Sequence, residues 1–190
     1  MDILLIDELA SENCYKKANL ITGFNSDESG FSLDMLYARL GISHDKFTRK
    51  DLTRLLSDHL IVCPEFGLAV DYSNQGNDVF MYEFKYKHRS SYSSTISPDA
   101  GVAVHGEEVT FVFGIPSESY INDVNINYIF TDADRELSHQ IITYWTNFAK
   151  YDNPNNNDAS SNLPTWDTLN PIDFSRSSAK EQMRPQFSFS

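Results

Sequence analysis

The strongest strand pattern in this chain is VFMYEFKY, residues Val79 to Tyr86. Aromatic and β-branched residues are enriched in strands, and successive side chains of a strand point to opposite faces. Here one face carries four aromatic rings, and the other carries Val79 and Met81. Because both faces are apolar, we expect a strand that is buried on both sides, as in a parallel sheet.

A second buried strand is predicted at NLITGFN, Asn19 to Asn25, which runs into the polar loop Ser26 to Gly30. Helical spacing of apolar residues predicts three helices. They cover Ser43 to Leu56, a segment from about Pro64 to Val70, and Thr131 to Lys150. Thr131 is the expected N-cap of the third helix, and Asp134 the expected partner in its capping box. Strands that alternate with helices in this way predict the α/β class.

Composition and charge exclude several classes of function. The 190 residues are 41% hydrophobic, enough for one core, and the net charge of −12 argues against nucleic acid or an anionic membrane as partner. No run approaches the roughly 20 apolar residues that span a bilayer, so no membrane insertion is expected. The first residues, Met1 to Asp7, lack the pattern of a secretory signal. No cofactor and no metal are expected, and Cys14 and Cys63 match no zinc spacing.

A loop carboxylate after the first strand and a loop histidine after the second come in the order of the acid and base of a hydrolase triad. A serine attacks an ester only if a histidine takes its proton, and a carboxylate must orient that histidine. Glu28 and His105 are the candidates for these two roles, although Asp27 could serve as the acid on chemistry alone.

Two longer stretches carry a family resemblance. KKANLITGFNSDESGF (Lys16 to Phe31) and GVAVHGEEVTFVFGIP (Gly101 to Pro116) resemble the acid loop and the histidine loop of type-B carboxylesterases and cholinesterases. Further similarity extends over about residues 6–166. The resemblance implies the C-terminal portion of an α/β-hydrolase fold, with Glu28 as triad carboxylate, His105 as general base, and Phe31 as an aromatic that lines the substrate gorge.

The same resemblance implies a carboxylic ester as substrate and a secreted or membrane-tethered extracellular location. We expect residues 1–152 to be the C-terminal part of an esterase domain, and composition indicates an Asn-, Ser- and Pro-rich tail over residues 153–190. The tail has few apolar side chains with which to dock, so we expect it to be only partly ordered. The apolar side chains of the tail that could dock are Leu163, Trp166, Leu169 and Phe174.

The departures from the family concern the nucleophile and a disulfide. No GxSxG motif occurs in these residues, and the nearest stretch, Gly41 to Asp45, lacks the second glycine. Cys63 is similar to a family cysteine whose partner lies near the C-terminus, where this chain has Arg184 and no cysteine. We therefore expect a chain that is inactive alone and that requires an N-terminal esterase portion. The alternative is a non-catalytic, esterase-like interaction or adhesion protein.

Three other expectations concern charged, aromatic and histidine side chains. Glu107 and Glu108 either tune the histidine, meet a cationic substrate, or form a solvated charge pair. Phe111 and Phe113 are expected in the core. The remaining histidines are expected to have no catalytic role. They are His44, His59, His88 and His139.

Overall fold

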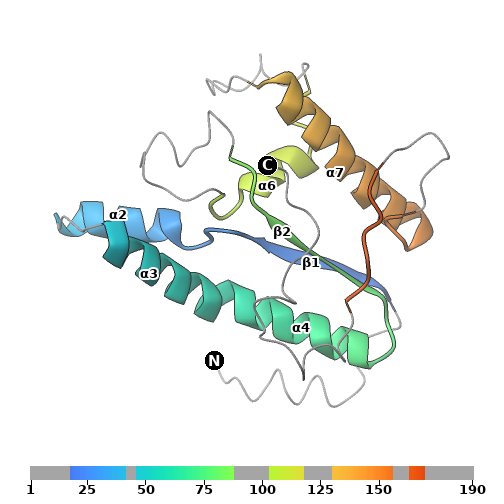
Figure 1. The fold of residues 1–190 in the computed structure, drawn as a ribbon, viewed down its shortest axis with the longest axis horizontal. Helices are drawn as coiled ribbons and strands as arrows, with labels where there is room; N and C mark the ends of the chain where they lie inside the picture. Colours follow the sequence, from blue (N-terminus) through green and yellow to red (C-terminus); the bar gives the residue numbers. More distant parts are fainter. Residues whose placement is uncertain (1–17, 42–45, 88–102, 118–129, 156–162, 170–190) are drawn as a thin grey trace.

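Two parallel strands form the centre of the molecule (Figure 1). The computed structural model describes residues 18–41, 46–87, 103–117, 130–155 and 163–169. Strand β1 (Leu20–Asn25) pairs in parallel with β2 (Val79–Phe84), with Leu20 opposite Val79 and Asn25 opposite Phe84. Both predicted strands are confirmed. The second ends at Phe84, two residues earlier than the sequence pattern indicated.

Helices cover the sheet on two sides, as the α/β class requires. The crossover from β1 to β2 consists of α2 (Gly30–Leu40), α3 (Lys46–Ser57), the π-helix η1 (Asp58–Val62) and α4 (Cys63–Asn74). On the opposite side of the sheet lie α6 (Glu107–Val112) and α7 (Asp132–Tyr151), as Figure 1 shows.

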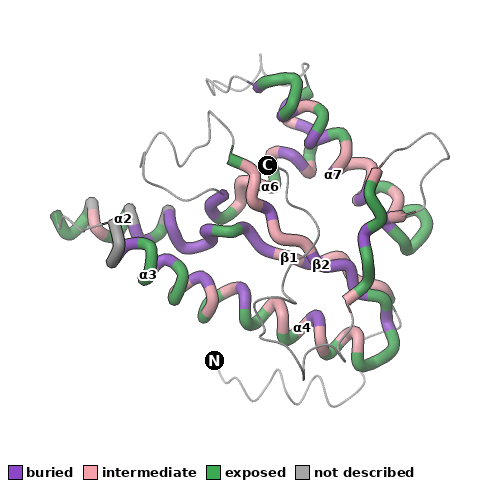
Figure 2. Tube along the Cα trace, in the orientation of Figure 1, coloured by how far each residue is buried: buried purple, intermediate pink, exposed green. Residues whose placement is uncertain are grey.

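Both faces of β2 are buried, as its sequence predicted (Figure 2). Val79 and Met81 pack with Ala69 of α4 in one hydrophobic cluster. On the other face, Phe80 packs with Tyr144 of α7 in a second cluster. A strand covered on both faces fixes its register firmly, because a one-residue slip would exchange the two sets of side chains.

The contact between the two strands requires a glycine in β1. Gly23 lies opposite Tyr82 in the parallel register. A Cβ atom at Gly23 would collide with the backbone oxygen and the ring of Tyr82. The absence of a side chain at Gly23 therefore allows the Tyr82 ring to lie over β1.

The long helix α7 begins and ends nearly as predicted. The Thr131 hydroxyl accepts a hydrogen bond from the Asp134 N–H at 3.2 Å, and the Asp134 carboxylate accepts from the Thr131 N–H at 2.6 Å. These two contacts form the predicted capping box. The helix continues to Tyr151, one residue beyond the predicted end.

Helices α3 and α4 are joined by η1 rather than by a loop, which the sequence did not predict. The N–H of Cys63 bonds to the carbonyl of Asp58, five residues earlier, and Pro64 then has no N–H to continue the ladder. The wider turn therefore lies directly before the proline. Helix α2 was likewise not predicted, because it begins at Gly30 inside the expected loop.

A segment from the Asn- and Ser-rich part of the chain packs along the outer edge of β2. The Trp166 Nε1–H donates to the Met81 carbonyl at 3.0 Å, and the Leu169 N–H donates to the Val79 carbonyl at 2.7 Å. Trp166 is buried among the rings of Phe80 and Tyr144. Residues 163–169 therefore cover polar groups that β1 does not reach.

One core prediction is wrong. Phe111 is buried, but Phe113 is 74% exposed. Phe113 follows the last residue of α6 as its C-cap, so it does not share the face by which Phe111 contacts β2 and α7. Within the described part of the chain, we find no helix long and apolar enough to cross a bilayer.

Candidate active site

The parallel sheet brings the loops after β1 and β2 together at one edge. The Asp27 N–H donates to the Ala103 carbonyl at 2.8 Å, and Asp27 forms an isolated parallel bridge with Val104. Carboxyl ends of parallel strands share an edge, so side chains in these two loops become neighbours although they are far apart in sequence. Glu28 and His105 directly follow the bridged residues.

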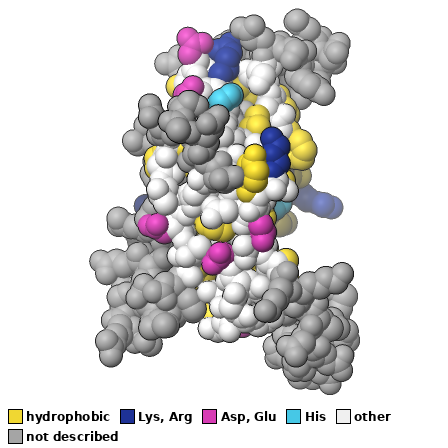
Figure 3. All heavy atoms as spheres, turned by 90° about the vertical axis from the view of Figure 1, so that its right-hand side faces the viewer, with side chains coloured by type: hydrophobic (Ala, Val, Ile, Leu, Met, Phe, Trp, Pro, Cys, Tyr) yellow, Lys and Arg dark blue, Asp and Glu magenta, His cyan; other side chains and the backbone are white. Residues whose placement is uncertain are grey.

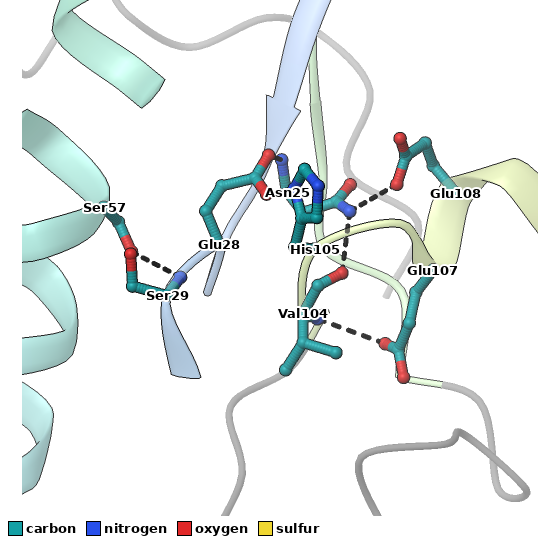
Figure 4. A network of polar contacts seen from close by, with 8 residues as sticks. All are labelled: Asn25, Glu28, Ser29, Ser57, Val104, His105, Glu107 and Glu108. Carbon is teal, nitrogen blue, oxygen red and sulfur yellow. Dashed lines mark hydrogen bonds and ion pairs between the residues drawn. The ribbon is translucent and has the colours of Figure 1, made fainter. Parts of the chain in front are cut away.

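Glu28 and His105 form a short hydrogen bond in the geometry that a triad requires (Figure 4). His105 Nδ1 lies 2.7 Å from Glu28 Oε2. An ionised carboxylate only accepts hydrogen bonds, so a neutral imidazole in this contact donates from Nδ1 and keeps Nε2 as its acceptor nitrogen. The Glu28 side chain is 5% exposed and that of His105 is 70% exposed. The acid is therefore enclosed while the imidazole is accessible.

A second donor fixes the Glu28 carboxylate. Its Oε1 atom accepts the Asn25 backbone N–H at 2.7 Å. Each carboxylate oxygen therefore has its own donor, one from the backbone of β1 and one from the imidazole. The carboxylate of Glu28 is therefore enclosed and hydrogen-bonded rather than solvated.

Asp27, the alternative acid, lies elsewhere. A Cβ atom at Gly30 would meet the carboxylate of Asp27 at 2.7 Å, which places this carboxylate at the start of α2. The imidazole of His105 bonds to Glu28 instead. Geometry therefore selects Glu28 as the partner of His105.

Helices α3 and α6 hold the two loops in place. The Ser57 hydroxyl, at the end of α3, accepts the Ser29 N–H at 3.0 Å, next to Glu28. In the other loop, Glu107 Oε2 at the start of α6 accepts the Val104 N–H at 3.2 Å, next to His105. Each half of the pair is thus adjacent to a residue that a helix anchors.

Asn25 and Glu108 belong to the same network, and the sequence pattern did not single out Asn25. The Asn25 side-chain amide donates to the Val104 carbonyl at 2.7 Å and to Glu108 Oε2. The only signal in the sequence is a polar residue at the end of a β-prone run. Glu107 and Glu108 are half-buried and hydrogen-bonded, so the solvated charge pair is the wrong alternative for them.

Burial and the carboxylates near the site raise the pKa of a tyrosine in the adjoining core. Burial raises the pKa of the Tyr82 hydroxyl, and the carboxylates of Glu108, Glu28 and Glu65 raise this pKa further. Tyr82 therefore stays neutral beside the pair. Among the residues that the structure describes, no cluster of three or more His, Cys, Asp or Glu side chains could hold a metal ion.

The other candidates contribute less to the site. Phe31 lies in α2, next to the acid loop, but its side chain is outside the described residues. His59 and His139 are exposed on helices. His44 and His88 lie outside the described residues, as does Cys14, and Cys63 is a free, exposed thiol.

The described residues combine an α/β layer arrangement with a contact between Glu28 and His105 at the carboxyl edge of two parallel strands, which is consistent with part of an α/β-hydrolase fold. Comparison with protein families agrees, because residues 37–186 match the model described as "Carboxylesterase family". The chain belongs to the carboxylesterase family.

Two of the similar curated proteins are named as acetylcholinesterases. The chain is 34% identical over 122 residues to "Acetylcholinesterase 1" of Caenorhabditis elegans, covering 64% of the chain and 18% of that relative. It is 37% identical over 124 residues to "Acetylcholinesterase" of Bungarus fasciatus, covering 65% of the chain and 19% of the relative. The chain thus aligns with about a fifth of the length of these relatives.

Proposed function

We propose that this chain is the acid-and-base portion of a cholinesterase-like serine carboxylic-ester hydrolase, with Glu28 and His105 as two members of the triad. The observation that supports the proposal is the 2.7 Å contact between His105 Nδ1 and Glu28 Oε2. The exposure of the imidazole and the burial of the carboxylate also suit these roles.

The proposed chemistry uses both ring nitrogens of His105. Nε2 accepts the proton of a serine hydroxyl as that oxygen attacks the ester carbonyl. Glu28 remains ionised, holds Nδ1–H and stabilises the imidazolium that forms. The imidazolium then protonates the leaving alkoxide, and the same two steps with water release the acid and restore the serine.

The nucleophile and the oxyanion hole belong to an esterase portion outside these residues. The 190 residues contain no GxSxG motif, and they align with only about a fifth of the named relatives. A histidine and a carboxylate without the serine lose the acyl-enzyme route and most of the rate enhancement. We therefore expect no esterase turnover by the chain alone.

The test is hydrolysis of a p-nitrophenyl ester by the chain, with and without an N-terminal esterase portion that carries the serine. Turnover is expected only in the mixture, and His105→Ala and Glu28→Gln should each abolish or severely reduce it. His139→Ala is the matched control, since this histidine is exposed on α7 outside the site. Esterase-level turnover by the chain alone that requires His105 would contradict the proposal.

A carboxylic ester is the substrate class we propose, and charge suggests which esters to compare. The net charge of −12 attracts cations at long range, although acidic side chains are scattered on the face in Figure 3. In the mixture of the two portions, lowering the salt concentration should therefore increase the rate of hydrolysis of a cationic choline ester more than that of a neutral ester. Equal salt dependence for the two esters would remove this preference.

The alternative function is a non-catalytic, esterase-like interaction protein. Exposed apolar side chains on α2 and α3 favour it, among them Leu36 at 50% and Leu55 at 63% exposed. An esterase portion that covers these helices would explain the same exposure. Absence of turnover in every mixture, together with capture of a partner that Leu36→Lys abolishes, would favour this alternative.

The proposal also includes the domain boundary, with residues 1–152 in the esterase domain and residues 153–190 as a partly ordered tail. The packing of residues 163–169 on β2 supports partial order in the tail. Limited proteolysis should cut within residues 153–190 before it cuts β1 or β2. First cuts inside the strands would contradict this boundary.

A further inference from the structure

Asn25 is a buried polar residue that touches both halves of the proposed pair. It is the last residue of β1 and is 1% exposed. Its backbone N–H donates to Glu28 Oε1. Any residue could supply that backbone donor, so this contact alone does not explain an asparagine.

The side chain of Asn25 makes the contacts that only an amide can make. Nδ2 donates to the carbonyl of Val104, the residue before His105, and to Glu108 Oε2. Two acceptors face this one atom, and an NH₂ group offers both with a hydrogen. Aspartate has the same shape but, when ionised, would face the carbonyl and the carboxylate with acceptors only.

The arrangement leaves one polar atom unsatisfied. Asn25 Oδ1 is buried and has no hydrogen-bond partner among the described residues. A buried acceptor without a donor destabilises a fold. Stability alone therefore gives no reason for an amide here, whereas the two contacts from Nδ2 do.

We infer that Asn25 is a positioning residue, which holds the backbone of the His105 turn at the distance from Glu28 that their hydrogen bond requires. The inference rests on the proposed function of the pair. Asn25 contacts the acid through its backbone and the histidine turn through its side chain, so one residue links the two groups directly.

Two other contacts hold the turn and should preserve the fold when the amide is lost. The Asp27 N–H still bonds to Ala103, and Glu107 still accepts the Val104 N–H. Asn25→Asp should therefore loosen the His105 side chain relative to Glu28 while both strands remain formed.

The experiment is proton NMR of the full chain, which follows the low-field resonance of the His105 Nδ1 hydrogen in its bond to Glu28. Loss of this resonance in His105→Ala assigns it. We expect Asn25→Asp to abolish the resonance while far-ultraviolet circular dichroism stays unchanged. Asn25→Ala removes the amide without adding a charge, should have the same effect, and decides the question if Asn25→Asp does not fold.

Ser138→Ala is the matched control. Ser138 is also 1% exposed, and its hydroxyl donates to the Phe111 carbonyl at 2.8 Å, so this variant loses a comparable buried contact away from Glu28. The resonance of the His105 Nδ1 hydrogen should persist in Ser138→Ala. The inference would be overturned if the His105 Nδ1 resonance persisted in the folded Asn25 variants, or if it were lost in Ser138→Ala as well. A wild-type chain without the resonance would instead contradict the proposed Glu28–His105 pair.

Discussion

Burial divides the Glu28–His105 pair into a fixed member and an accessible member. Glu28 is enclosed and held by two donors, while the imidazole projects outward from a turn whose neighbours Ala103 and Val104 are buried. Such a difference suits a group that orients and a group that exchanges protons. The two residues of the pair thus differ in their exposure to solvent.

Tyr144 gives a residue-scale prediction for alkaline pH. Burial raises its pKa from 10.0 to about 12, and its hydroxyl donates to the Pro164 carbonyl at 2.5 Å. The unfolded chain loses this proton first, so the free energy of unfolding should fall between about pH 10 and about pH 12 by up to roughly 3 kcal/mol.

Urea unfolding across this range measures the effect. Tyr144→Phe should be less stable at neutral pH, because it lacks the hydrogen bond to Pro164. The free energy of unfolding of Tyr144→Phe should also fall less at alkaline pH than that of the wild type. Tyr151→Phe, at an exposed position, is the control. Parallel pH profiles for wild type and Tyr144→Phe would contradict the assignment.

The sequence predicted the residues of the pair but not the residue that joins them. Glu28 and His105 stand in distinctive local motifs, so resemblance identified them. Asn25 acts through the carbonyl of Val104 and the carboxylate of Glu108, which become neighbours only after folding. A pattern within one segment does not contain such a contact.

Local signals predicted β1, β2 and α7, while two helical features depended on context. Helix α7 has its own cap, and each strand has its own apolar pattern. The π-helix η1 lies directly before Pro64, which has no N–H to donate. Helix α2 begins at a glycine and has no acidic residue in its first turn. Neither has a strong start signal in its own residues.

Strand pairing predicts a large effect at Gly23. Gly23→Ala places a methyl group against the backbone oxygen and ring of Tyr82, so we expect destabilisation by about 1–3 kcal/mol. Gly67→Ala is the matched control, because a Cβ atom at Gly67 in α4 meets nothing within 4 Å. That change should stabilise the helix by up to about 1 kcal/mol. Equal effects in chemical denaturation would refute the close approach.

The capping box predicts a smaller effect at the start of α7. Thr131→Ala removes the acceptor for the Asp134 N–H and a donor to the Asp134 carboxylate, and should lower stability by about 0.5–2 kcal/mol. Thr131→Ser keeps the hydroxyl and should lose little. Thermal unfolding of the two variants compares them, and a Ser variant as unstable as the Ala variant would argue against the cap.

Residues 163–169 connect the sheet to α7. Trp166 packs edge-on to the rings of Phe80 and Tyr144, with ring centroids 6.1 and 5.5 Å apart. Its indole N–H also satisfies the Met81 carbonyl. The Asn- and Ser-rich composition around it predicted little order, because one buried tryptophan barely changes a composition.

Trp166 should therefore contribute strongly to global stability. Trp166→Ala is expected to lower the free energy of unfolding by about 3–5 kcal/mol, because it leaves a cavity between β2 and α7. Leu163→Ala, at a half-buried position of the same segment, should lower it by less. Urea denaturation of both variants provides the measurement, and a mild effect at Trp166 would mean that this segment is peripheral.

The parallel pairing of β1 and β2 also governs the order of events as the chain folds. Glu28 and His105 are 77 residues apart, and the crossover helices must be traversed before the two loops can meet. Helices form from local contacts, whereas closure of so long a loop has an entropic penalty that only the completed sheet offsets. The contact between Glu28 and His105 should consequently form late, so any intermediate that accumulates during refolding would already be helical and still lack this contact.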